Sequence, residues 1–115
     1  MAWQKSSPEL VERFGRVLDR FPDVERRKMF GYPAGFVGGN MVTSLFEESC
    51  VVRLDAAGLD DARAAGATAF DPMGGRPMKN YATLPASVMQ DDEAIAGWVE
   101  RAVEHGRSMP IKAKS

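Results

Sequence analysis

Residues 24–54 read VERRKMFGYPAGFVGGNMVTSLFEESCVVRL, a stretch in which short runs of β-branched and aromatic residues alternate with glycine-containing turns. This pattern is typical of strands joined by hairpins, and it predicts strands at 26–30, 34–37, 41–46 and 50–54. Gly38-Gly39-Asn40 is the strongest hairpin signal, because glycine adopts left-handed backbone angles freely and asparagine tolerates them. Connections this short leave no room for a crossover, so neighbouring strands are expected to be antiparallel.

A helical pattern precedes these strands. Ser7 is suited to cap a helix and Pro8 to occupy its first turn, while Pro22 is expected to end it. The apolar residues of this segment recur at helical spacing and form one stripe. They are Leu10, Val11, Phe14, Val17, Leu18 and Phe21.

The segment after the strands combines a short helix, a loop and one more strand. The alanine-rich stretch 60–65 predicts the helix, which Gly66 stops. Asp71-Pro72 and Gly74-Gly75 indicate a loop over 68–77. A fifth strand is expected over 78–84, closed by Pro85.

The last helix is the most regular element of the sequence and is predicted from about residue 91 or 92 to residue 106. Its apolar face consists of Ile95, Trp98, Val99, Ala102 and Val103. Trp98 is the largest of these, so we expect it to clamp the helix onto the sheet. Trp3 precedes every periodic segment and is expected to lie outside the core.

The order of elements predicts a two-layer α+β fold, with an antiparallel sheet of about five strands and the helices on one face. The chain is expected to form one domain over 1–115, with its core at about 8–106 and a C-terminal tail at 107–115. Large residues occupy both parities of the strands, as Met41 and Leu45 alternate with Val42 and Phe46. The second face of the sheet is therefore expected to be apolar, and such a face tends to bind a partner.

Composition excludes several functional classes. The 115 residues carry a formal net charge of -1, which argues against tight non-specific binding to nucleic acid or to anionic membranes. The sequence contains neither a signal peptide nor a long apolar span, so a cytoplasmic location without membrane contact is expected. The single cysteine, Cys50, rules out an intramolecular disulfide and fits a reducing compartment.

No set of residues points to catalysis. Cys50 as a nucleophile would need a base such as the single histidine, His105, but no nucleophile motif surrounds it, and a buried structural role is expected instead. Adjacent acids such as Asp60-Asp61 and Asp91-Asp92 point in different directions on a helix. We therefore expect no enzyme activity, no metal site and no cofactor.

Two other patterns offer a binding site. Arg76 and Lys79 lie beside the flexible Gly74-Gly75 and are suited to hold an anion, with Met73 or Met78 as apolar walls. The run 26–28 is basic and is followed by Tyr32 and Phe36, as in proteins that bind single-stranded nucleic acid. Alternation in a strand puts Arg27 on the face opposite Arg26 and Lys28, so a solvated edge strand is the favoured interpretation.

An ordered set of short motifs resembles a known family. The motifs are Met29-Phe30-Gly31, Gly38-Gly39-Asn40, Val51-Val52-Arg53-Leu54-Asp55, Arg76-Pro77-Met78, Tyr81, Leu84-Pro85 and a tryptophan-bearing helix from Trp98 to Ala102. Over about residues 8–106 they resemble the N-terminal domain of the TfoX/Sxy family, bacterial proteins named for a regulator of competence. The resemblance implies a curved antiparallel sheet, similar to that of secretion-chaperone-like domains, and no catalytic residues.

In full-length regulators of this family, the domain precedes a second, helical domain and the protein promotes transcription of DNA-uptake genes. This chain stops at Ser115, so we expect a stand-alone copy that acts as a regulatory or protein-interaction module through its sheet face or an edge strand. The partner is expected to be another protein or, in a homodimer, a second copy of the chain. The contact residues predicted are Tyr32, Phe36, Arg76, Lys79 and Tyr81. The alternative is a domain that binds a small anionic ligand.

Overall fold

The computed structural model describes residues 4–72 and 74–111. It contains helices and strands in an order that matches the two-layer α+β fold predicted from the sequence. The elements are α1 (Pro8–Leu18), β1 (Glu25–Met29), β2 (Tyr32–Val37), β3 (Asn40–Phe46), β4 (Ser49–Arg53), α2 (Ala56–Ala64), β5 (Thr68–Ala69), β6 (Tyr81–Thr83), a 3-10 helix η1 (Ala86–Val88) and α3 (Asp92–Ser108). Within these ranges, no helix combines the length and the apolar composition needed to cross a membrane.

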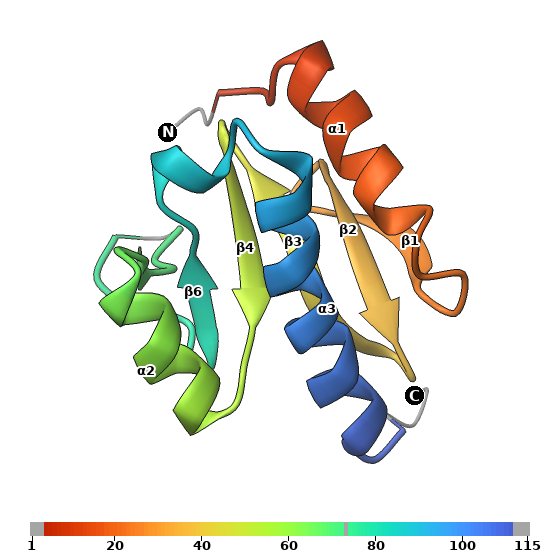
Figure 1. Cartoon of the computed structure of the whole chain (residues 1–115), viewed down its shortest axis with the longest axis vertical. Coiled ribbons are helices and arrows are strands. Elements are labelled where there is room, and N and C mark those ends of the chain that lie inside the picture. Colours follow the sequence, from red (N-terminus) through yellow and green to blue (C-terminus); the bar gives the residue numbers. More distant parts are fainter. Residues whose placement is uncertain (1–3, 73, 112–115) are drawn as a thin grey trace.

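The strands form one antiparallel sheet in the order β1-β2-β3-β4-β6-β5 (Figure 1). The four strands expected within 24–54 are confirmed, with ends that shift by one or two residues. The sheet has six strands instead of about five. The additional strand consists of Thr68 and Ala69, which lie in the segment predicted as a loop and pair with Thr83 and Ala82. A strand of two residues is too short to show alternation, so the sequence pattern did not reveal it.

Tight turns join the first three strands. Gly38 and Gly39 both have positive φ angles, 58° and 84°, as the hairpin signal predicted. The turn between β1 and β2 has the same form, but its positive φ angles belong to Phe30 at 55° and Gly31 at 84°. Phenylalanine is disfavoured in this left-handed region, and Phe30 was expected inside a strand.

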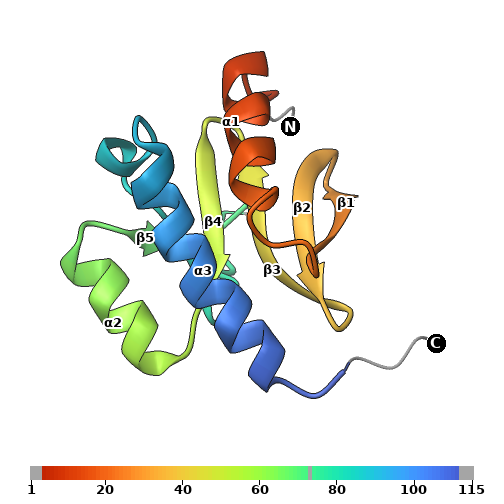
Figure 2. The ribbon, with the colours of Figure 1, turned by 45° about the vertical axis from the view of Figure 1, so that its right-hand side comes forward.

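The helices cover one face of the sheet. α3 lies across β3 and β4, α1 lies beside it, and α2 contacts β6 at the far end (Figures 1 and 2). The carboxylate of Asp92 at the start of α3 pairs with Arg13 of α1 at 2.6 Å and with Arg16 at 3.2 Å. These ion pairs hold the two helices together at their polar edges, above an apolar core that both helices share with the sheet.

α2 begins earlier than predicted, at Ala56 instead of Asp60. Its N-cap is Asp55, whose side chain accepts a hydrogen bond from the backbone N–H of Gly58 at 2.8 Å. Asp60 and Asp61 therefore lie in the middle of the helix instead of at its start. The capping residue directly after β4 is what sets the start of this helix.

Trp98 is not the anchor of α3. Its side chain is half-buried, and the guanidinium group of Arg101 lies over its ring at 5.2 Å from the centroid. Ile95, Val99 and Val103 are the fully buried large residues of the helix. Trp98 lies at the border of the apolar stripe, where a large ring remains partly exposed. Trp3 lies outside the described residues, so its predicted place outside the core stays a prediction.

The second face of the sheet is apolar, as expected, but it is not open throughout. Ala34, Phe36 and Met41 form a buried cluster separate from the main core. The rings of Tyr32, Phe46, Phe70 and Tyr81 form a row of neighbouring pairs with centroids 5.2, 5.4 and 6.4 Å apart. Phe36 and Met41 are buried, and neither is among the described residues with exposed large apolar side chains, so the expected open apolar surface is not seen at this cluster.

Candidate binding surfaces

A groove of about 520 Å³ lies where the β1–β2 turn meets the first half of α1 and the segment before it. We call it the turn groove. It is lined by Lys5, Ser6, Val11, Lys28, Phe30, Gly31, Tyr32 and Pro33. The β1–β2 turn lies beside α1 in both views of the ribbon (Figures 1 and 2). The side chains that line the groove thus come from three separate parts of the chain.

The turn groove gathers exposed apolar side chains. Among the described residues, the large hydrophobic side chains that are exposed are Val11 at 39%, Phe30 at 43% and Ile111 at 82%. Val11 and Phe30 both line this groove, whereas Ile111 lies against Gly38 at the other end of the sheet. Single exposed apolar residues are ordinary, but two that share one concave surface are typical of a contact site.

Hydrogen bonds hold the segment that forms one wall of the groove. The backbone N–H of Gln4 donates to a carboxylate oxygen of Glu47 at 3.0 Å, and that of Ser7 donates to Glu48 at 2.6 Å. The hydroxyl of Tyr32 donates to the carbonyl oxygen of Gln4. This network ties residues 4–7 to the β3–β4 turn and to β2, and it places Lys5 at the groove.

The charged side chains that line the groove are basic. Lys5 and Lys28 line it, and none of its lining residues is acidic. In the part of the chain that the structure describes, neither lysine forms an ion pair. Glu47 and Glu48, the acids tied to its wall, already accept hydrogen bonds from backbone N–H groups. Its charge is therefore available to a ligand.

The predicted alternation of the basic run is confirmed. Arg26 pairs at 2.6 Å with Asp19, the C-cap residue of α1, and Lys28 lines the turn groove on the same side of β1. Arg27 points to the other face, where its guanidinium group lies 5.2 Å from the centroid of the Phe36 ring. The three cations form no common patch, and β1 is an edge strand as expected.

The residues predicted from sequence as contacts do not form one site. Tyr32 lines the turn groove but is only 5% exposed, and Phe36 is 8% exposed beneath Arg27. Tyr81 is half-buried beside the Phe36 cluster, and its hydroxyl donates to the carbonyl oxygen of Met41 at 3.0 Å. The structure thus brings Phe36 and Tyr81 into one apolar cluster. The other predicted contact residues lie outside this cluster.

The side chains of Arg76 and Lys79 lie exposed in the loop that precedes β6, and their suggested role in holding an anion stays a prediction. The loop itself is held by Asp71. Its carboxylate accepts hydrogen bonds from the backbone N–H groups of Gly75 at 2.8 Å and Arg76 at 3.2 Å. Met73, suggested as an apolar wall, lies outside the described residues. These hydrogen bonds from the backbone to the Asp71 carboxylate hold the loop in a tight turn.

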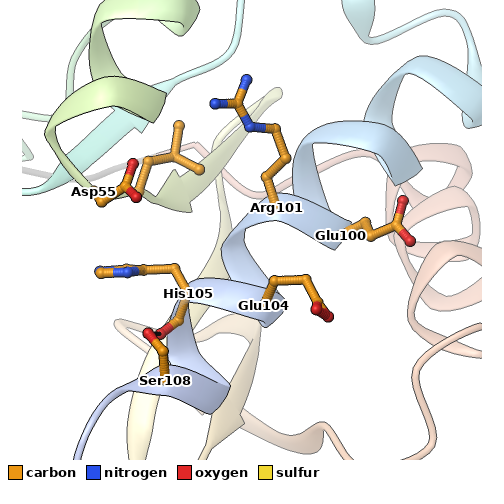
Figure 3. A pocket seen from close by; sticks show the side chains of 7 residues that line it. Asp55, Glu100, Arg101, Glu104, His105 and Ser108 are labelled. Atoms are coloured by element: carbon orange, nitrogen blue, oxygen red, sulfur yellow. Dashed lines mark hydrogen bonds between the residues drawn. The ribbon is translucent and has the colours of Figure 1, made fainter.

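A second hollow, of about 430 Å³, lies between the start of α2 and the last turns of α3 (Figure 3). Arg101 and His105 extend on the side of Asp55, whereas Glu100 and Glu104 extend to the other side of α3. Arg101 pairs with Asp61 of α2 at 3.0 Å, and Glu104 pairs with Arg107 of α3 at 2.9 Å. The charges of this hollow are largely neutralised within the protein, and its carboxylates do not converge on the histidine.

Cys50 is buried in β4, as expected, and has no contact with a base. Its Sγ atom lies 3.6 Å from the hydroxyl of Thr43 and 4.0 Å from the carbonyl oxygen of Val51. Burial raises the pKa of the Cys50 thiol to about 12. His105 instead lines the hollow between α2 and α3. Across residues 4–72 and 74–111, no group of His, Cys, Asp and Glu is placed to hold a metal ion.

Because the Cys50 thiol is buried, we expect the free energy of unfolding to depend on pH in the alkaline range. The unfolded thiol ionises near pH 9.0, whereas the folded one keeps its proton to about pH 12. Between these values the unfolded state binds fewer protons, so the thiol lowers wild-type stability by up to about 1.4 kcal/mol per pH unit. Cys50→Ala is expected to cost about 1 kcal/mol at neutral pH, and this cost should shrink above about pH 9 in urea unfolding. A cost that is constant up to about pH 11 would contradict the assignment.

Sequence reasoning missed the residues that make the groove distinctive. Val11 was assigned to the buried stripe of the first helix, and Phe30 to the end of a strand. The available signal was the two-residue connection Phe30-Gly31, since in a tight hairpin the residue before the glycine also takes left-handed angles. Arg53 was also missed. In the described residues it has no ion pair, its Nε atom is buried without a hydrogen bond, and its guanidinium group lies 5.5 Å from the Tyr81 ring centroid.

Comparison with known families gives one match. The family model described as the TfoX N-terminal domain matches residues 16–106. The matched range runs from the last turn of α1 almost to the end of α3 and includes the β1–β2 turn. A search of curated proteins found no match.

Proposed function

The chain belongs to the TfoX N-terminal domain family, and from this premise we propose that it is a cytoplasmic regulatory module that binds a protein partner through the turn groove. The edge strand β1 adjoins the groove, and within residues 4–72 and 74–111 no strand pairs with its outer side. The partner contact is made by Val11 and Phe30, with Tyr32 and Pro33 forming the floor. The module acts by binding and carries out no reaction.

The observation that carries this proposal is the backbone of Phe30. A non-glycine residue in the left-handed region costs on the order of 1 to 3 kcal/mol. An asparagine or glycine at this turn position would avoid that cost. The strained turn instead presents a large ring that is 43% exposed. A ring held in this way is well placed to bury itself against a partner.

Two observations favour binding a protein over the other functions considered. The Cys50 thiol is buried, and its hydrogen-bond partners are Thr43 and Val51, which gives no support to nucleophilic chemistry. The backbone N–H groups of Gly75 and Arg76 are occupied by Asp71, which gives none to a small anion in that loop. The turn groove combines apolar area with open charge, as protein contact sites do.

The experiment that tests the proposal is a comparative capture from extract of the native cell. The immobilised wild-type chain is compared with Phe30→Asp, which places a charge in the groove. Ile111→Asp is the matched control, because Ile111 is even more exposed but lies outside the groove. We expect at least one protein to be retained by the wild type and by Ile111→Asp and to be lost with Phe30→Asp.

The captured protein is then purified, and its binding to the three chains is measured directly. A loss of about tenfold or more in affinity with Phe30→Asp alone supports the groove as the contact surface. If all three chains retain the same proteins with equal affinity, the proposed function is wrong. Circular dichroism and urea unfolding of each variant separate lost binding from lost folding.

A further inference from the structure

The turn groove also specifies the chemistry of its occupant. We propose that the partner contributes an acidic segment, in which a bulky apolar side chain is flanked by carboxylates. This inference rests on the proposed function and adds the identity of the recognised class. The apolar side chain enters the groove between Val11 and Phe30, and the carboxylates reach Lys5 and Lys28.

The cations around the groove differ in whether an acidic side chain already pairs with them. Arg13 and Arg16 of α1 are engaged by Asp92, and Arg26 of β1 is engaged by Asp19. Lys5 and Lys28 are the cations that line the groove, and in the described residues they form no ion pair. Two unpaired positive charges beside one apolar surface attract a segment with carboxylates and repel a basic one.

The acids near the groove do not line it, and most of them are engaged by other groups. Glu12 of α1 lies 3.6 Å from Arg16, and the carboxylates of Glu47 and Glu48 accept backbone N–H groups of residues 4 and 7. Glu9 is exposed in the first turn of α1 and is not among the residues that line the groove. The two lysines have no acidic side chain paired with them in the described residues, so the partner is expected to supply the carboxylates.

The size of the groove fits a segment better than a flat protein surface. Its volume of about 520 Å³ is enough for a small number of side chains, and its apolar lining comes from Val11, Phe30, Tyr32 and Pro33. Recognition by one or two apolar anchors in a groove is a common way to bind a short peptide segment. The lysines at the rim then select among such segments by charge.

The chain's own C-terminal segment does not match this chemistry. Residues 109–115 read MPIKAKS and contain one large aliphatic residue followed by two lysines. Their charge has the same sign as that of the groove, so this segment is a poor occupant in the same chain or in a second copy. The occupant is therefore assigned to a different protein, and binding of a second copy is an outcome that the test distinguishes.

The test uses three fluorescent peptide probes of equal length and the full chain. The first alternates glutamate with leucine and phenylalanine, the second has lysine in place of every glutamate, and the third has serine in place of every apolar residue. Binding is followed by fluorescence anisotropy at low and at moderate salt. We expect the acidic apolar probe to bind about tenfold more tightly than either of the others, and to weaken as salt rises.

Charge reversal identifies the groove as the site. Lys28→Glu is expected to weaken the acidic apolar probe by about tenfold and to make the lysine probe the preferred one. Lys79→Glu is the matched control, because Lys79 is an exposed lysine that lies in the loop before β6 and does not line the groove. It makes the same change in net charge and should leave the order of the probes unchanged.

The failure of this inference is distinct from the failure of the proposed function. The inference is overturned if the lysine probe binds the wild type as well as the acidic one, or if Lys28→Glu and Lys79→Glu act alike. It is also overturned if sedimentation shows a dimer that Phe30→Asp dissociates, since a second copy then occupies the groove. In each case a partner whose retention depends on Phe30 leaves the proposed function standing.

Discussion

Gly106→Ala is expected to lower the free energy of unfolding by about 2 kcal/mol, although alanine is the better helix former. Gly106 lies where α3 packs closely against β2 and β3. A Cβ atom built there would overlap Cγ1 of Val42 and would lie 3.3 Å from Cβ of Val37. Val42 is fully buried and its side chain is short and branched, so it has no free space to move into. The added methyl group therefore pushes the end of α3 away from β2 and β3.

The same helix provides the control. Gly97 is exposed on α3, and a Cβ atom there would meet nothing within 4 Å. Gly97→Ala is therefore expected to raise the free energy of unfolding by up to about 1 kcal/mol through helix propensity alone. Urea unfolding of the two variants and the wild type measures both changes. If Gly106→Ala is as stabilising as Gly97→Ala, then α3 does not approach the sheet as closely as described.

Phe30→Asn is expected to abolish most partner binding and to leave the protein folded. Asparagine relieves the left-handed strain of the β1–β2 turn, but the covered part of the Phe30 side chain is lost. These effects oppose each other, so stability should stay within about 1 kcal/mol of the wild type. The ring's contact with the partner is lost outright, which for a central anchor costs about 2 kcal/mol, or about 30-fold in affinity.

This prediction is checked by calorimetric titration of the purified partner into the wild type and Phe30→Asn. Urea unfolding of the two chains is measured in the same buffer. An affinity within about twofold of the wild type would show that Phe30 is not an anchor. A stability loss of several kcal/mol would show that the ring serves the fold instead.

The strands were predictable because each carries its own local signal. Residues 24–54 contain short runs of β-branched and aromatic residues, and the turn between two of these runs is marked by Gly38-Gly39-Asn40. The features that were not predictable depend on distant contacts. Gly106 is predicted to end the last helix, yet α3 continues to Ser108. The glycine is needed instead for the close contact between α3 and Val42. Local patterns cannot distinguish these two uses of glycine.

The binding surface was less predictable than the fold, for a related reason. Tyr32 was identified as a contact residue and does line the turn groove, but Phe30 was assigned to a strand. Phenylalanine has a low intrinsic preference for left-handed backbone angles, so the sequence alone predicts Phe30 in a strand and not in the turn. Likewise, the sequence shows glycines beside Arg76 but does not show that Asp71 accepts hydrogen bonds from the backbone N–H groups of Gly75 and Arg76. In both places, only the folded chain shows which groups are already engaged.

The most direct test of the account is a cross-link from the turn groove itself. A photoreactive phenylalanine analogue is incorporated in place of Phe30, or in place of Ile111 as the control, and the native cells are irradiated. The account predicts a covalent adduct from position 30 to one partner protein, attached within an acidic segment, and no such adduct from position 111. Adducts that are the same from both positions, or none from position 30, would contradict it.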